Sequence, residues 1–153
     1  MPRNYLDRSL AAPLLLLNFT FYVIVLGIAG WSLDIMIGQV VIGQVAVRTP
    51  DLYGNAATPM FVIFTLIACV VGIGSILISS HLANGWGAEH ASTVISIATL
   101  AWSLLVLAFG VACKEISIGH TNATLKFMEI FVITLAVTHS LYLIVVWKGH
   151  ERV

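Results

Sequence analysis

The chain has 153 residues, of which 59% are hydrophobic and 9% are charged, whereas a soluble domain carries roughly 25% charged residues. Its seven basic and seven acidic side chains give a net charge of zero, which argues against nucleic acid as a partner because phosphates require a basic face. This composition predicts a membrane protein whose main partner is lipid.

Four segments are apolar and long enough to cross a hydrocarbon core of ~30 Å, which takes roughly 20 helical residues. Backbone groups in lipid must be satisfied within the segment, so each is expected to be helical. The predicted spans are residues 11–33, 59–80, 90–113 and 125–147. The sequence therefore predicts an all-α membrane protein with a single domain over residues 1–153, an antiparallel bundle of four transmembrane helices.

Signals for helix starts support the first two spans. The apolar run Leu10–Leu33 is longer than the apolar region of a signal peptide, roughly 7–15 residues, so we interpret it as a retained span. Ser9 is expected to cap this helix, with Pro13 in its first turns. The second helix is expected to use Thr58 as its cap and Pro59 as its first helical residue.

The distribution of basic residues predicts the orientation. An even number of spans places both termini on one side, and cytoplasmic sides carry the excess of Lys and Arg. The side with the termini has Arg3, Arg8, Lys148 and Arg152, and the other side has Arg48, Lys114 and Lys126. We therefore expect cytoplasmic termini and an outer loop at residues 34–58.

The outer loop begins with an apolar stretch, Ile35–Val47, that is too short for a fifth span. Its many β-branched residues favour extended structure over helix. We therefore expect a strand or hairpin that covers the outer end of the bundle, as in claudin-like proteins.

Three polar residues inside the spans are predicted to share one depth. Asn18, Thr99 and His139 each lie eight or nine residues from the inner end of their span, which corresponds to ~12–14 Å. One interpretation is a proton or carboxylate relay that depends on His139. The other is interhelical hydrogen bonding that fixes packing, at about 0.6 kcal/mol per contact.

Small residues recur at helical spacing in two spans. The third carries Ser92, Ser96, Thr99 and Ser103, and the second carries Ala68 and Gly72. Such stripes let helices approach closely. The alternative for the third span is a hydroxyl-lined path for a small solute.

Other kinds of site are not predicted. Cys69 and Cys113 lie in separate apolar segments and are expected to remain unbridged. His81, Glu89 and His90 lack the ligand spacing of zinc motifs, so neither a metal nor a cofactor is expected. The sequence contains no catalytic triad motif and no phosphate-binding loop in its structural context, so we do not expect an enzyme.

Five stretches of the sequence resemble a known family. They are "PLLLLN" (13–18), "YVIVLGIAGW" (22–31), "NAATPMF" (55–61), "ACKEISIG" (112–119) and "LKFMEIFVI" (125–133). Together they resemble the AWPM-like (PM-nineteen) family of plant plasma-membrane proteins induced by abscisic acid. The resemblance implies a four-span protein of the dehydration and cold response that mediates abscisic acid uptake. The family has no settled catalytic motif, so it assigns no active-site residue.

Charged residues gather at the expected outer end. Lys114, Lys126 and Arg48 would attract an organic carboxylate such as abscisate, and Glu115 or Glu129 could hold a proton that accompanies it. A weak acid crosses lipid far more readily when neutral, which makes proton-linked uptake physically sensible. The alternative is that Lys114 and Glu129 complement the dipoles of their helices.

Two further expectations concern modification and assembly. Asn122 begins the glycosylation sequon Asn122-Ala123-Thr124 on the expected outer side. The alternative to transport is a claudin-like tetraspan that forms homo-oligomers and organises the plasma membrane under stress. A solvated pocket between the helices would favour transport over this second function.

Overall fold

In the computed structural model, the described residues are 3–41, 55–82, 88–119 and 122–150. They form the helices α1 (Arg3–Val41), α2 (Thr58–Leu82), α3 (Ala88–Ile118) and α4 (Ala123–His150), and they contain no strand. Side chains are described for residues 12–38, 55–81, 92–119 and 122–148.

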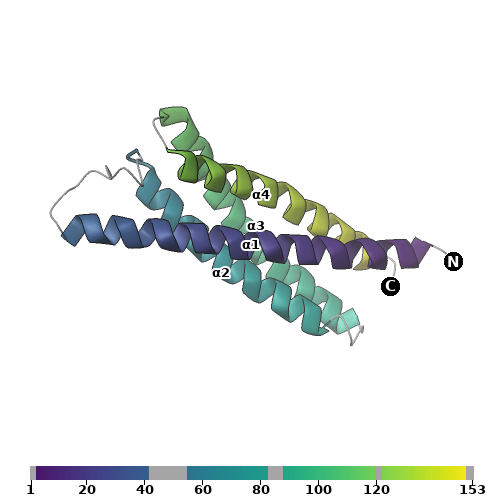
Figure 1. The fold of residues 1–153 in the computed structure, drawn as a ribbon. Coiled ribbons are helices and arrows are strands. Elements are labelled where there is room, and N and C mark those ends of the chain that lie inside the picture. The colour runs from purple at the N-terminus through teal and green to yellow at the C-terminus, as the bar shows by residue number, and fades with distance from the viewer. Residues whose placement is uncertain (1–2, 42–54, 83–87, 120–121, 151–153) are drawn as a thin grey trace.

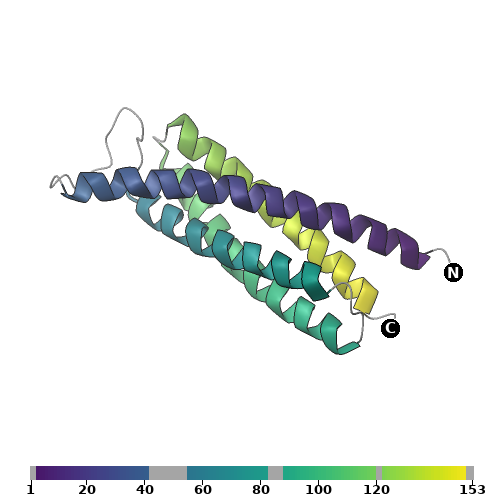
Figure 2. The ribbon, with the colours of Figure 1, turned by 60° about the horizontal axis from the view of Figure 1, so that its bottom comes forward.

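The helices form an antiparallel bundle. Each packs against two neighbours, in the pairs α1–α2, α2–α3, α3–α4 and α1–α4. The chain reverses direction from each helix to the next, so both termini lie at the same end (Figures 1 and 2). We call this the terminal end and the opposite one the distal end. The predicted four-helix bundle is confirmed.

Each helix contains a segment that can cross a membrane. The segments are Ala12–Gly38, Thr58–His81, Ser92–Ile118 and Ala123–Lys148, and they have 24 to 27 residues. At ~1.5 Å per residue they extend over about 36–40 Å, which exceeds a hydrocarbon core of ~30 Å. Large apolar side chains such as Leu16, Met60, Leu100 and Ile130 are exposed on the outside of the bundle, where lipid would solvate them.

Small residues occupy the contacts between helices. Several alanines are fully buried, namely Ala29, Ala68, Ala98, Ala101, Ala108 and Ala112. A β-carbon at Gly72 of α2 would clash with the ring of Tyr22 on α1. Small side chains therefore set the helix spacing where hydrophobicity cannot drive association.

Helix α1 is longer at both ends than its predicted span. It begins at Arg3, so Ser9 is not its cap and Pro13 lies in its interior. The expected strand over residues 35–47 is wrong for residues 35–41, which are helical, while residues 42–47 lie outside the described residues. The preference of β-branched residues for strands contributes little free energy. Continuing the helix, by contrast, keeps the backbone N–H and C=O groups hydrogen-bonded and buries Met36.

The end of α3 and the start of α4 each have a defined cap. Helix α3 continues past Cys113 and ends at Ile118, and the next residue, Gly119, has a positive φ of 72°. The Gly119 N–H donates to the carbonyl of Glu115 at 3.1 Å, an arrangement typical of a glycine helix cap. Asn122 then caps α4, because its Oδ1 accepts a hydrogen bond from the Leu125 N–H at 3.1 Å.

The hydroxyl stripe on α3 faces away from the bundle. Ser96, Thr99 and Ser103 are exposed, and each hydroxyl donates to a carbonyl of its own helix. The stripe on α2, by contrast, is buried at Ala68 and Gly72. Packing therefore explains the α2 stripe but not the α3 stripe.

Candidate functional site

Asn55 organises the start of α2 at the distal end. Its Oδ1 accepts from the Ala57 N–H at 2.9 Å, and its own N–H donates to Oγ1 of Thr58 at 2.8 Å. These reciprocal bonds correspond to a helix capping box. Asn55 is therefore the cap of α2, and the expectation that Thr58 fills this role is wrong.

The Asn55 side chain also connects α2 to the end of α3. Its Nδ2 donates to the carbonyl oxygens of Glu115 at 3.0 Å and Gly119 at 3.1 Å. The last carbonyls of a helix have few partners within the helix, and this amide adds a second donor to the Glu115 carbonyl, which already accepts from the Gly119 N–H. The stretches 55–61 and 112–119, which carry the family resemblance, thus meet in space.

Thr58 links this region to a buried carboxyl group. Its Oγ1 donates to Oε1 of Glu115 at 2.6 Å. Glu115 is fully buried, and its second oxygen, Oε2, has no hydrogen-bond partner. An acidic side chain is almost never fully buried unless it is paired, so Glu115 is an unusual residue for a purely structural position.

A second buried carboxyl group lies at the same end of the bundle. Glu129 of α4 is 5% exposed, and its Oε1 also lacks a partner. Glu115 lies in the last turn of α3 and Glu129 near the start of α4, so both carboxyl groups belong to the distal end. We refer to Asn55, Thr58, Glu115, Gly119 and Glu129 as the distal cluster.

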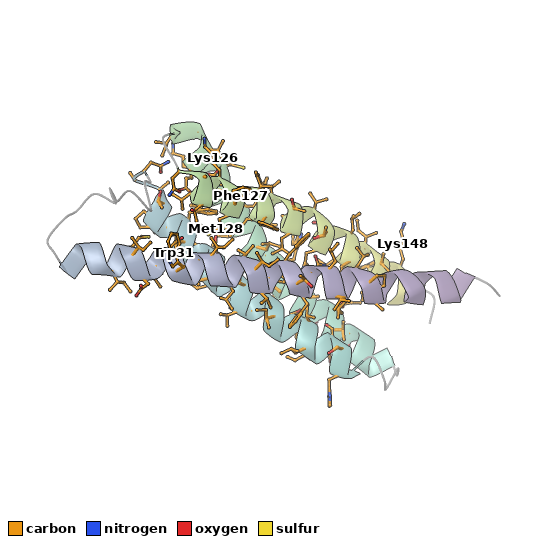
Figure 3. All side chains as sticks on the ribbon, in the orientation of Figure 1. Trp31, Lys126, Phe127, Met128 and Lys148 are labelled. Carbon is orange, nitrogen blue, oxygen red and sulfur yellow. The ribbon has the colours of Figure 1, made fainter. Side chains whose placement is uncertain are left out.

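The predicted charged residues divide into two groups. Glu115 and Glu129 are both buried at the distal end, whereas Lys114 and Lys126 are exposed. Figure 3 places Lys126 near the distal end of α4 and Lys148 near the terminal end. Arg48 lies outside the described residues.

A second polar group lies midway along the bundle, around His139. The hydroxyl of Tyr22 is 3.1 Å from His139 Nδ1, and His139 Nε2 is 3.2 Å from the carbonyl oxygen of Ala98. A carbonyl only accepts hydrogen bonds, so Nε2 carries the proton and Nδ1 accepts from Tyr22. These contacts connect α1, α4 and α3 through one imidazole ring.

Aromatic packing completes this central contact. The rings of Tyr22 and His139 lie edge to face with centroids 5.9 Å apart, and Tyr142 approaches His139 similarly at 5.8 Å. The Tyr22 ring rests against Gly72, which brings α2 into the same contact. We refer to Tyr22, Gly72, Ala98 and His139 as the central cluster, and it joins all four helices.

The predicted polar layer is only partly assembled. Asn18 is buried, and its Oδ1 accepts a hydrogen bond from Thr138 at 2.6 Å. Thr99 is exposed and bonds the carbonyl of Ile95, so the neighbouring Ala98 contributes to the layer instead. Sequence reasoning missed Tyr22, whose distance of four residues from Asn18 places both on one helix face.

Some buried polar atoms remain without a partner. They are Nδ2 of Asn18 and the hydroxyl groups of Thr65 and Ser75, in addition to the two carboxylate oxygens of the distal cluster. Buried polar groups are normally hydrogen-bonded to protein or water. Within the described residues, these are the buried polar atoms that the helices leave unsatisfied.

Other candidate sites receive no support from the described residues. They contain no group of three or more His, Cys, Asp or Glu side chains that could hold a metal ion. Cys69 is buried, Cys113 is exposed, and both are free thiols. Asn122 caps α4 through its side-chain oxygen, and its glycosylation stays a prediction.

Comparison with known proteins agrees with the resemblance in the sequence. The AWPM-19-like family matches residues 16–149. Membrane protein PM19L of Oryza sativa subsp. japonica is 41% identical over 143 residues, which cover 93% of this chain and 79% of that protein. No solved structure matches. With four helices long and apolar enough to cross a membrane, the chain belongs to the AWPM-19-like family of membrane proteins.

Proposed function

We propose that this protein mediates the uptake of abscisic acid across the plant plasma membrane. The resemblance of its sequence to proteins of the abscisic acid response supports this substrate. The structural observation that carries the proposal is the distal end, where the exposed cations Lys114 and Lys126 accompany the buried carboxyl groups of Glu115 and Glu129.

The chemistry of abscisic acid explains why such an end is useful. At neutral pH this weak organic acid is an anion, and an unpaired charge enters lipid only at a high cost in free energy. Surface cations raise the local concentration of an anion and speed its arrival. Buried carboxyl groups are suitable proton donors, and a protonated substrate crosses an apolar region more easily.

The interior of the bundle supports passage of a polar solute. Unpaired donors occur on Asn18 of α1 and on Thr65 and Ser75 of α2. They would hydrogen-bond to a carboxyl group or to water that moves with it. The Tyr22 ring lies between the levels of Thr65 and Ser75, against Gly72, and has to move aside for transport.

The proposed function includes an orientation of the bundle in the plasma membrane. The distal end faces the outside of the cell, and the termini face the cytoplasm. The excess of Lys and Arg on the side of the termini, four residues against three, favours this arrangement. With it, Lys114 and Lys126 meet external abscisate.

The test is uptake of labelled abscisate into liposomes that contain the purified protein. The internal and external pH are kept equal, so the neutral acid is not trapped by a pH difference. We expect saturable uptake that unlabelled abscisate inhibits. Uptake no faster than that of protein-free liposomes would end the proposal.

A second candidate is a tetraspan that does not transport but associates with itself and organises the membrane. The central cluster favours it, because the contacts of Tyr22 and His139 hold all four helices together. Liposome experiments distinguish the two candidate functions. A self-associating tetraspan would form cross-linked oligomers and would not raise abscisate uptake.

A further inference from the structure

We propose that Glu115 is a neutral carboxylic acid in this bundle, with its proton on Oε2 while Oε1 accepts the hydrogen bond from Thr58. The contact between α2 and α3 at the distal end is then a proton-binding site. The use of this proton in uptake rests on the function proposed above, whereas the proton itself does not.

The hydrogen bonds around Thr58 show which oxygen of Glu115 acts as the acceptor. The Asn55 N–H donates to Oγ1 of Thr58 at 2.8 Å, and this Oγ1 is 2.6 Å from Oε1 of Glu115. A hydroxyl has a single hydrogen to donate, and here it is directed at the carboxyl group because Oγ1 already receives the backbone N–H. Oε1 is therefore the carbonyl-type oxygen, and a proton on this carboxyl group belongs on Oε2.

A charge on Glu115 would lack the partners that a buried charge requires. The side chain is fully buried, and its Oε2 has no hydrogen-bond partner. Desolvation of a carboxylate costs several kcal/mol unless ion pairing and hydrogen bonds to both oxygens offset it. One proton on Oε2 removes the charge and keeps the bond from Thr58 to Oε1.

The charges at the distal end do not neutralise Glu115. Among the described residues, the other charged side chains at this end are Lys114 of α3, Lys126 and Glu129 of α4, and Asp34 of α1. Both lysines are exposed, and the two acidic residues add negative charge. From α2, the neutral Thr58 contacts the carboxyl group. Glu115 also lies in the last turn of α3, where the helix dipole disfavours a negative charge.

Glu129 is less suited to hold a proton in this way. It lies near the start of α4, away from the negative end of that helix dipole. Lys126 stands three residues before it, a spacing that places both side chains on one face of the helix. A cation is thus available to Glu129 on its own helix, which makes Glu129 a matched comparison for Glu115.

The proton of Glu115 has a balanced role in uptake. An ionised glutamate would repel abscisate, whereas Oε2–H can donate a charge-assisted hydrogen bond to its carboxylate. The Oε2–H bond then breaks and an O–H bond forms on abscisate, so Glu115 becomes negative and the substrate neutral. A proton taken up from water restores the acid. Because Glu115 is fully buried, these exchanges require the distal contact between α2 and α3 to open.

Carbon NMR of the whole protein in liposomes without abscisate tests the site, with the side-chain carboxyl carbons of glutamate labelled. The resonance that disappears in Glu115→Gln belongs to Glu115, and its shift distinguishes a carboxylic acid from a carboxylate. At neutral pH we expect a carboxylic acid, in the wild type and also in Glu129→Gln, because the surroundings of Glu115 itself hold the proton. A Glu115 carboxylate in either protein would overturn the inference.

Variants of Thr58 test the position of the proton. Thr58→Val removes the donor to Oε1 and should shift the Glu115 carboxyl resonance, while Thr58→Ser should keep it near the wild-type position. Thr134→Val is the control, because the Thr134 hydroxyl donates to the Ile130 carbonyl of its own helix, and it should leave the resonance unchanged. An unchanged resonance in Thr58→Val would overturn the assignment of the proton to Oε2.

A salt titration at constant pH tests a cation as the alternative occupant. The Glu115 resonance should not change when sodium or potassium is added, and its conversion to a carboxylate would overturn the proton in favour of the ion. The measurement also separates this inference from transport. A protonated Glu115 without uptake would remove the proposed function alone, and uptake with an ionised Glu115 would remove the proton site alone.

Discussion

Tyr22 of α1 and Gly72 of α2 meet so closely that the tyrosine ring occupies the space where a β-carbon at position 72 would stand. The same ring carries the hydroxyl that bonds His139. Close approach of two helices and a hydrogen bond to a third thus depend on one tyrosine. The predictions below begin with this contact and continue to the distal end.

Gly72→Ala should destabilise the bundle. The added methyl group displaces the Tyr22 ring, and overpacking of this kind costs about 1–3 kcal/mol. Thermal unfolding in detergent measures the effect. Gly74→Ala is the matched control on the same helix, because a β-carbon at position 74 has no atom within 4 Å. Equal effects of the two variants would contradict the contact.

Tyr22→Phe should lower the free energy of unfolding by about 1 kcal/mol. The ring remains in place, but Nδ1 of the buried His139 loses its donor. Thr99→Val removes a hydroxyl that bonds only its own helix on the outer surface and should have almost no effect. A larger loss of stability in Thr99→Val than in Tyr22→Phe would contradict the assigned faces.

The tautomer of His139 can be measured directly. The carbonyl of Ala98 requires a proton on Nε2, and Nδ1 accepts from Tyr22. We therefore expect nitrogen chemical shifts of the Nε2–H tautomer in NMR spectra of the labelled protein. In Tyr22→Phe the Nδ1 shift should change most. An Nδ1–H tautomer would be incompatible with the bond to Ala98, because neither Nε2 nor the carbonyl could then donate.

Thr58→Val should destabilise the distal end by about 1–3 kcal/mol, because it removes the donor to a fully buried carboxyl group. Thr58→Ser keeps the hydroxyl and should recover most of the stability. Thr134→Val is the control, since Thr134 is partly exposed and bonds only the Ile130 carbonyl. Similar unfolding temperatures for Thr58→Val and Thr134→Val would argue against the Glu115 bond.

The sequence predicts the number and course of the helices well, because each span must be long, apolar and helical in lipid. It predicts depth better than orientation around the helix axis. His139 and Thr99 do lie at a similar depth, but Thr99 faces outward, and the carbonyl of Ala98 takes its place. A backbone carbonyl that accepts a hydrogen bond cannot be recognised from the side chain of its residue, so a search of the sequence for polar side chains misses it.

Local propensity misled the prediction where the surroundings decide the structure. The β-branched residues after Leu33 favoured a strand, yet α1 continues to Val41. The caps were predictable in part, since Gly119 follows the last turn of α3 and Asn55 stands three residues before Thr58. The burial of Glu115 and Glu129, on separate helices, required the structure.

Uptake of labelled abscisate by liposomes is the most direct test of the central claim, when the wild type is compared with Lys126→Ala and Lys148→Ala. Both lysines are exposed, and they lie near opposite ends of α4 (Figure 3). With protein inserted so that the distal end faces outward, Lys126→Ala should raise the half-saturating concentration several-fold and keep the maximal rate, while Lys148→Ala changes neither. Wild-type uptake equal to that of protein-free liposomes would contradict the proposed function.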